Sequence, residues 1–186
     1  LSLTTISPRW PSWILVFSSP SPAVLGLRPV ATKILSDKIE NATGGSVWAN
    51  DNQTIFYTRK DKVTLRSDKI YKHKLGADVT KDVLVFHEKD DTFDVSVSKE
   101  KSKKYIVIGS SSTLTTEFQI LPADQPDGEF KIFQKRTRGL EYHIAHYGDS
   151  FYIVTNKDKA TNFKLMKTPE SATGMENWND IIAHRK

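Results

Sequence analysis

A group of four short strand patterns that returns three times along the chain constrains its fold more than any other feature. In the middle copy, runs rich in β-branched and aromatic residues lie at 92–98, 104–110, 115–121 and 129–134. The other two copies span about 46–88 and 140–184. Equivalent residues of the second run, Phe56, Ile106 and Tyr152, follow one another at steps of 50 and 46 positions. A four-strand unit with a period of about 40–50 residues is typical of a β-propeller blade.

The sequence therefore predicts an all-β chain that forms a partial β-propeller. We expect about three complete four-stranded antiparallel blades, at about 46–88, 92–134 and 140–184, plus part of a preceding blade, within a domain of residues 33–186. The apolar run Ile106–Ile108 indicates a strand buried on both faces, whereas the alternation in Phe93–Val97 indicates one wetter face. A twelve-strand β-sandwich is the alternative, but a sandwich has no reason to keep a constant four-strand period.

Residues 1–32 differ in composition from the rest of the chain. They contain five of the eight prolines and two of the four tryptophans, but no acidic residue. We interpret them as an atypical leader that is either disordered or altered by a local reading-frame error. The apolar run Trp13–Phe17 is far shorter than the roughly 20 residues that span a bilayer, so we expect no membrane contact.

Charge and composition disfavour several classes of function. The 27 Lys and Arg residues exceed the 22 Asp and Glu residues by only five, and the two signs interleave, so we expect no nucleic-acid partner. Because the chain has no cysteine, it has no disulfide and no Cys-based metal site; we expect a cytoplasmic location, with an organelle left open. His143 and His146 lie three positions apart on a predicted strand and therefore on opposite faces, so we expect no metal or other cofactor.

Two short motifs are candidates for function. The run Gly109–Ser112 lacks the Gly-x-Ser-x-Gly pattern and the strand-to-helix turn that activate a serine, which favours a structural turn. The run Glu88–Asp91 places three carboxylates in the connection between two predicted blades. Such a run is usually a solvated turn. As a functional site, it would form an acidic rim that raises the local concentration of cationic ligands.

Several segments together resemble one known protein group. The resemblance is carried by Val47–Asp51, His87–Phe93, Ser112–Glu117, Leu140–Tyr142 and Phe151–Ile153, and it extends continuously from about Ile34 to Arg185. These segments resemble the propeller of the oligopeptidase B branch of the prolyl oligopeptidase family of serine peptidases. Residues 1–30 depart from the resemblance.

The resemblance implies that this propeller works with an α/β-hydrolase catalytic domain that the chain does not contain. That domain carries a Ser-Asp-His triad, so the resemblance assigns no catalytic residue here. It implies cleavage of short basic peptides after Arg or Lys, with the propeller as the gate that excludes folded proteins. The gating residues expected at the hydrolase-facing end of the blades are Glu88, Asp90, Asp91, Phe93, Ser111 and Ser112.

A function from a different class stays open at this point. The chain would then be a stand-alone β-propeller-like scaffold for protein–protein interaction. The full coding sequence separates the two: a Gly-x-Ser-x-Gly elbow downstream indicates a peptidase, and a stop codon after Lys186 indicates a scaffold.

Overall fold

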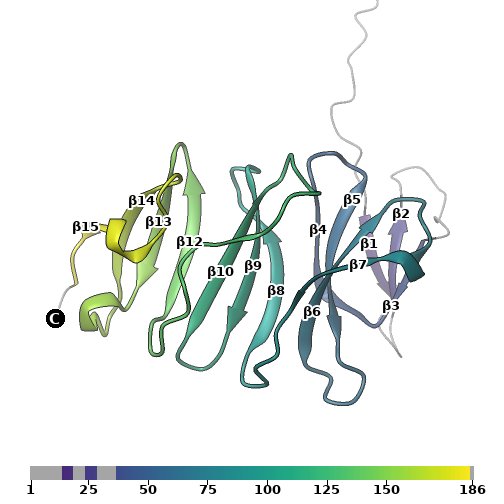
Figure 1. The fold of residues 1–186 in the computed structure, drawn as a ribbon, viewed down its shortest axis with the longest axis horizontal. Helices are drawn as coiled ribbons and strands as arrows, with labels where there is room; N and C mark the ends of the chain where they lie inside the picture. Colours follow the sequence, from purple (N-terminus) through teal and green to yellow (C-terminus); the bar gives the residue numbers. More distant parts are fainter. Residues whose placement is uncertain (1–13, 19–23, 29–36, 185–186) are drawn as a thin grey trace, which may run out of the picture.

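Four antiparallel sheets stand side by side in an arc in the computed structural model, which describes residues 14–18, 24–28 and 37–184 (Figure 1). The first sheet has three strands, in the order β1-β2-β3. Each of the other three has four strands that pair in chain order. The partial propeller predicted from the repeat is confirmed, because every complete blade is a meander of consecutive antiparallel strands.

In the third blade, the first three strands begin and end within two residues of the predicted runs. The first sheet consists of β1 (Ile14–Ser18), β2 (Val24–Arg28) and β3 (Lys38–Glu40). The second consists of β4 (Ala42–Trp48), β5 (Thr54–Lys60), β6 (Ser67–Lys74) and β7 (Val83–His87). The third consists of β8 (Asp94–Lys99), β9 (Tyr105–Ser111), β10 (Thr116–Pro122) and β11 (Lys131–Ile132). The fourth consists of β12 (Tyr142–Tyr147), β13 (Ser150–Thr155), β14 (Lys164–Pro169) and β15 (Asn179–Ile182). Three single-turn 3-10 helices lie in the connections: η1 (Val79–Lys81), η2 (Lys157–Lys159) and η3 (Met175–Asn177).

Burial along the strands explains the two sequence patterns. The residues of β9 from Tyr105 to Ser110 are all buried, because β9 lies in the middle of its sheet and is covered on both faces. In β8 the buried residues Val95 and Val97 alternate with exposed ones. The strand β11 is shorter than predicted, with only two residues paired to β10, although the N–H of Phe133 still donates to the Phe118 carbonyl at 2.8 Å.

The hydrophobic cores lie mainly between neighbouring blades. Side chains of the second blade, such as Phe56 and Ile70, pack against Val95 and Ile106 of the third blade. The core between the third and fourth blades is built from large side chains: Tyr105, Val107, Ile120, Phe133, Leu140, Tyr142, Phe151, Ile153, Met166 and Trp178. Each blade is therefore stabilised by the next one, as in other repeat folds.

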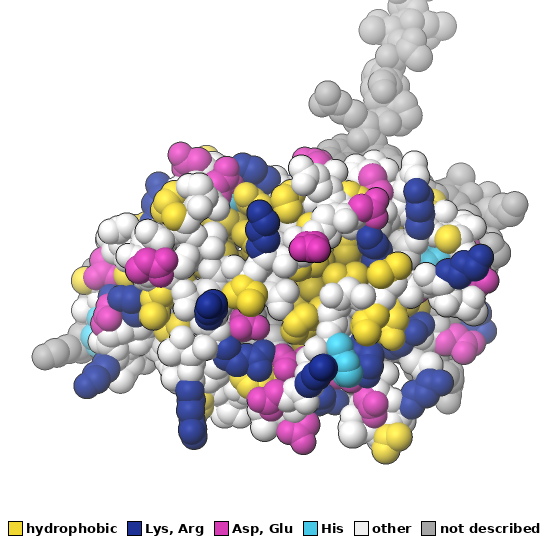
Figure 2. Space-filling view, viewed as in Figure 1, with side chains coloured by type: hydrophobic (Ala, Val, Ile, Leu, Met, Phe, Trp, Pro, Cys, Tyr) yellow, Lys and Arg dark blue, Asp and Glu magenta, His cyan; other side chains and the backbone are white. Residues whose placement is uncertain are grey.

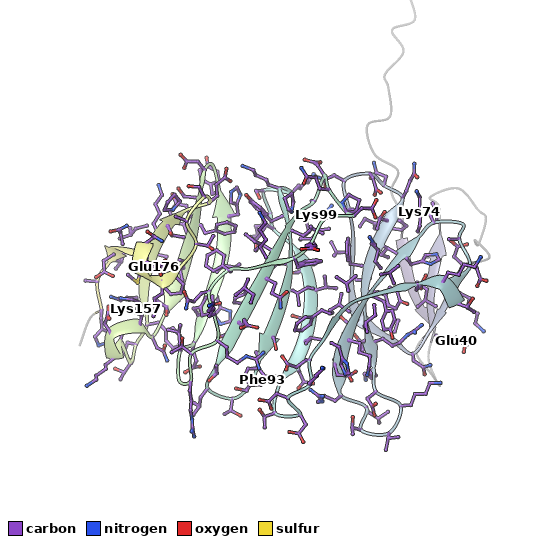
Figure 3. All side chains as sticks on the ribbon, in the orientation of Figure 1. Glu40, Lys74, Phe93, Lys99, Lys157 and Glu176 are labelled. Carbon is purple, nitrogen blue, oxygen red and sulfur yellow. The ribbon has the colours of Figure 1, made fainter. Side chains whose placement is uncertain are left out.

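The connections are sorted between the two ends of the blades. Since consecutive strands run antiparallel, the turn after the second strand and the link to the next blade lie at the same end. Phe93 in one such link and Lys157 in one such turn both lie at the lower end in Figure 3, whereas Lys74 and Lys99 lie at the upper end. We call the end with Phe93 and Lys157 the link end of the blades.

Part of the segment 1–32 forms regular structure. Strands β1 and β2 pair with each other, and β2 also pairs with β3, where Leu25 lies opposite Ile39. The remaining positions of the predicted leader lie outside the described residues. Within the described parts of the chain, no helix has the length and apolar character needed to cross a membrane.

Candidate functional site

The link between the second and third blades, residues 88–93, is held around a buried carboxylate. Glu88 is 5% exposed. Its Oε2 accepts hydrogen bonds from Arg136 Nη2 at 2.6 Å and from Ser110 Oγ at 2.5 Å, and its Oε1 accepts one from the Asp90 N–H at 3.0 Å. Burial by itself favours the neutral carboxyl, but these hydrogen bonds outweigh it and hold the pKa of Glu88 below its ordinary value. Glu88 is thus an ionised residue paired inside the protein.

Two arginines from other connections hold this link, Arg66 through its backbone and Arg136 through its side chains. Arg66, from the β5–β6 turn, donates to the carbonyl oxygens of Glu88 at 3.2 Å, Asp90 at 2.8 Å and Phe93 at 2.5 Å. Arg136, from the link into the fourth blade, lies 3.7 Å from the ring centroid of Phe93, which is a cation–π distance. Three connections at the link end are therefore tied together by the contacts of these two charged side chains.

The other two carboxylates of the link point to solvent. Asp90 is exposed, and its Oδ1 accepts from the Thr92 N–H at 3.0 Å and from Thr92 Oγ1 at 2.7 Å. These hydrogen bonds hold the pKa of Asp90 below its ordinary value, so its carboxylate is ionised at neutral pH. Asp91 is also exposed. Of the three carboxylates in the acidic rim that the sequence suggested, only Asp90 and Asp91 are exposed, and Glu88 is buried.

The two predicted serines lie in the adjacent β9–β10 connection. Ser111 is the exposed last residue of β9 and pairs with Asp94 on one side and Thr116 on the other. The Ser112 N–H donates to the Thr115 carbonyl at 2.9 Å, closing a tight turn. The structure therefore places Ser111 and Ser112 at the link end, one connection further along the same blade edge.

Sequence reasoning missed the residues that organise this site. Arg66, Ser110 and Arg136 come from three separate segments, and each looks like an ordinary polar residue at the end of a strand or in a turn. Their common target appears only when the blades stack. Counting charged residues does not single out this site, because basic and acidic side chains are interspersed over the whole visible face of the molecule (Figure 2).

The described residues hold no group of three or more His, Asp or Glu side chains arranged to bind a metal ion. His143 is exposed and His146 is buried, so the two ring systems lie on opposite faces of β12, as predicted. What the link end does present is the exposed carboxylates of Asp90 and Asp91, which can attract a cationic ligand by charge.

Replacing Glu88 with Gln should weaken the fold and flatten its response to acid. A carboxylate whose pKa is lowered on folding adds stability above its ordinary pKa of 4.5, and this contribution is lost as the pH falls through the lower folded value. We expect Glu88→Gln to cost about 1–2 kcal/mol near neutral pH, because Arg136 loses its nearer carboxylate and keeps only Glu117, at 3.5 Å. Urea unfolding of both proteins between about pH 3 and pH 7 measures the effect. Parallel stability curves would contradict it.

Comparison with known proteins places these features in a family. Residues 24–186 match the family model described as "Prolyl oligopeptidase, N-terminal beta-propeller domain". The chain is 39% identical over 153 residues to a dipeptidyl aminopeptidase BI of Pseudoxanthomonas mexicana, which covers 82% of this chain and 21% of that protein. It is 37% identical over 139 residues to a protease 2 of Moraxella lacunata, covering 74% of this chain and 20% of that protein. The chain thus spans about a fifth of the length of these relatives.

Solved structures agree with this assignment. Oligopeptidase B from Leishmania major superimposes with a TM-score of 0.80 at 26% identity, covering 88% of this chain and 23% of that one. Oligopeptidase B from Trypanosoma brucei, with covalently bound antipain, gives a TM-score of 0.78 at 25% identity over 93% of this chain and 26% of that one. With its meander blades, the family match and these relatives, the chain belongs to the prolyl oligopeptidase family of serine peptidases, within the N-terminal β-propeller domain.

Proposed function

We propose that this chain is the substrate-gating part of an oligopeptidase B-like serine endopeptidase that cleaves short peptides after Arg or Lys. The catalytic residues would come from an α/β-hydrolase domain docked at the link end. In this proposal the propeller supplies no reacting group: it limits the size of what enters and attracts substrates by charge.

The observation that carries the proposal is the fixed acidic link at residues 88–93. Arg66 holds its backbone and Arg136 pairs with the Glu88 carboxylate, so Asp90 and Asp91 are the exposed carboxylates of the link. Ionised carboxylates at the entrance of a cavity raise the local concentration of peptides bearing Arg or Lys.

Exposed aliphatic side chains at the same end support a docked partner domain. Val63 and Leu65, in the β5–β6 connection, are 89% and 65% exposed, and Leu114, in the β9–β10 connection, is 63% exposed. These connections follow the second strands of two consecutive blades, so the three side chains project from the link end. A domain docked at this end would cover these three side chains and remove their apolar surface from water.

Reversing the charge of Asp91 tests the charge-steering part of the proposal. In a full-length enzyme that contains this propeller, Asp91→Lys should lower kcat/KM for an Arg-containing peptide about three- to fivefold at low salt, since two units of charge change at roughly 10 Å from the ligand. The loss should disappear near 0.5 M salt, because the charges are then screened. Steady-state hydrolysis at several salt concentrations is the measurement.

The matched control is Glu129→Lys, which makes the same charge change at an exposed position in the β10–β11 connection, at the opposite end of the blades. It should leave kcat/KM unchanged at every salt concentration. If both variants reduce kcat/KM equally, or if Asp91→Lys shows no dependence on salt, the acidic link does not steer the substrate.

A further inference from the structure

A cavity of about 420 Å³ lies at the link end of the fourth blade, beside the β13–β14 connection. Its apolar part is formed by the buried residues Leu140 and Ala160 and the partly buried Met175. The opposite wall is the connection itself, residues 156–161. Lys157 in this wall lies at the same end of the blades as Phe93 (Figure 3). A volume of this order is within the range of small-ligand sites and accommodates about two amino-acid residues.

The wall of the cavity has a strained backbone that ion pairs hold in place. Asp158 and Lys159 have φ values of 58° and 61°, in the left-handed region that non-glycine residues rarely adopt. The Asp158 carboxylate pairs with Lys157 Nζ at 2.9 Å and with Lys164 Nζ at 2.8 Å. Lys164 is buried in β14 and also pairs with Asp180 at 2.8 Å, so the connection is anchored to the sheet. The cavity is therefore shaped before any ligand binds, which lowers the entropy cost of binding.

One cation in this wall has no acidic partner. The ammonium groups of Lys157 and Lys164 are occupied by Asp158. Lys159 is exposed, and within the described part of the chain no carboxylate lies within ion-pair distance of its ammonium group. The Asn156 side chain is already used: it accepts from the Glu141 N–H at 2.9 Å and donates to the Gly139 carbonyl at 2.9 Å. Lys159 is thus the group at this site that is free to meet an anion.

We propose that this cavity binds the carboxyl-terminal end of a short peptide. A small or aliphatic last side chain would pack on Leu140, Ala160 and Met175, and the terminal carboxylate would pair with the Lys159 ammonium group. An apolar floor beside one cation that has no acidic partner suits a ligand whose charge lies at one end, whereas an inorganic anion would gain nothing from the apolar floor.

The inference depends on one part of the proposed function, namely that peptides reach the link end because the protein is part of a peptidase. It adds a second feature of the substrate: Asp90 and Asp91 would attract basic side chains, whereas Lys159 would recognise a free chain terminus. Short peptides with a free carboxylate would then be preferred over the same peptides with a carboxyl-terminal amide.

Fluorescence anisotropy on the 186-residue chain tests the inference. The probes are an amino-terminally labelled Gly-Ala-Ala-Leu with a free carboxylate and the same peptide with a carboxyl-terminal amide. We expect the acid to bind about three- to fivefold more tightly than the amide, which is the effect of one ion pair to an exposed lysine. Lys159→Gln should reduce the affinity for the acid to that for the amide, and Lys159→Arg should restore most of the difference.

Lys101→Gln is the matched control, because it removes the charge of an exposed lysine in the β8–β9 connection at the opposite end of the blades. It should bind both probes like the unmodified chain. Equal binding of acid and amide, or equal effects of Lys159→Gln and Lys101→Gln, would overturn the inference. Neither probe contains a basic residue and the assay contains no hydrolase domain, so a failure here is distinct from a failure of the salt-dependence test on Asp91.

Discussion

Replacing His73 with Ala should lower the free energy of unfolding by about 3–5 kcal/mol, because it leaves two buried carboxylates without their shared partner. His73 is fully buried in β6. Its Nδ1 lies 2.6 Å from Asp82 Oδ1 and its Nε2 lies 3.2 Å from Asp37 Oδ2, and both aspartates are buried to a similar degree. The imidazole thus connects the segment before β3 to the segment before β7.

The neighbouring donors cannot replace the imidazole. Asp37 also accepts from the Gly76 N–H at 2.6 Å, and Asp82 accepts from the Tyr57 hydroxyl at 2.8 Å. Burial, followed by the Asp82 carboxylate, raises the pKa of Tyr57, so its hydroxyl remains a neutral donor. With His73 removed, the printed donors that remain are the Gly76 N–H for Asp37 and the Tyr57 hydroxyl for Asp82, and neither replaces the ring nitrogen that each carboxylate loses.

Urea unfolding of His73→Ala measures the loss, and His87→Ala is its matched control. His87 lies in the same blade, but its side chain is 38% exposed and pairs with Asp68 at 3.4 Å. Because His87 is partly exposed and the buried Asp68 keeps its ion pair with Lys69, this variant should cost at most about 1 kcal/mol. Similar losses for the two variants would show that the buried network contributes little.

Replacing Phe133 with Ala should lower the free energy of unfolding by about 3–5 kcal/mol, because it opens a cavity in the core between the third and fourth blades. The side chain is 1% exposed. Its ring lies 4.9 Å from that of Phe151 in an edge-on contact, and 6.2 Å and 6.3 Å from the rings of Tyr142 and Trp178. Since Phe133 belongs to the third blade and these partners to the fourth, the substitution also weakens the contact between the blades.

The preceding residue provides the control for this variant. Ile132 is 50% exposed on the outer strand β11, and Ile132→Ala should change stability by no more than about 0.5 kcal/mol. Chemical denaturation of both variants separates the roles of the two residues. A loss for Phe133→Ala as small as that for Ile132→Ala would mean that the blades do not depend on this core.

The blades themselves could be predicted from the sequence because their signals are local. The consecutive apolar positions around Ile106 indicate a strand covered on both faces, and the alternation in Val95–Val97 indicates one with an exposed face. The turns between such runs are too short for helices, so neighbouring strands must pair as a meander. The fourth strand of the third blade was the least accurate, because the pairing of Lys131 and Ile132 depends on the shape of the preceding Pro- and Gly-containing turn.

The sequence proposed a candidate site but did not show how its side chains are arranged. The run Glu88–Asp91 marked this connection as a candidate, and a charge count treated its three carboxylates as equivalent. In the structure, Glu88 is buried against Arg136 and Ser110, whereas Asp90 and Asp91 are exposed. The same holds for Lys159: the sequence does not distinguish it from Lys157 and Lys164, but in the described structure those two form ion pairs with Asp158 and Lys159 forms none.

By itself, then, the sequence determined the strands, their four-strand grouping and the arc of blades, since each depends on hydrophobic period and turn chemistry within about 50 residues. Only the tertiary structure decided which charges are paired, which are buried and where a cavity remains. Arg66, Glu88 and Arg136 lie up to 70 positions apart, and they meet because stacked blades bring their connections together at one end. The pairing of charges depends on distance in space and on burial, which the order of residues along the chain does not reveal.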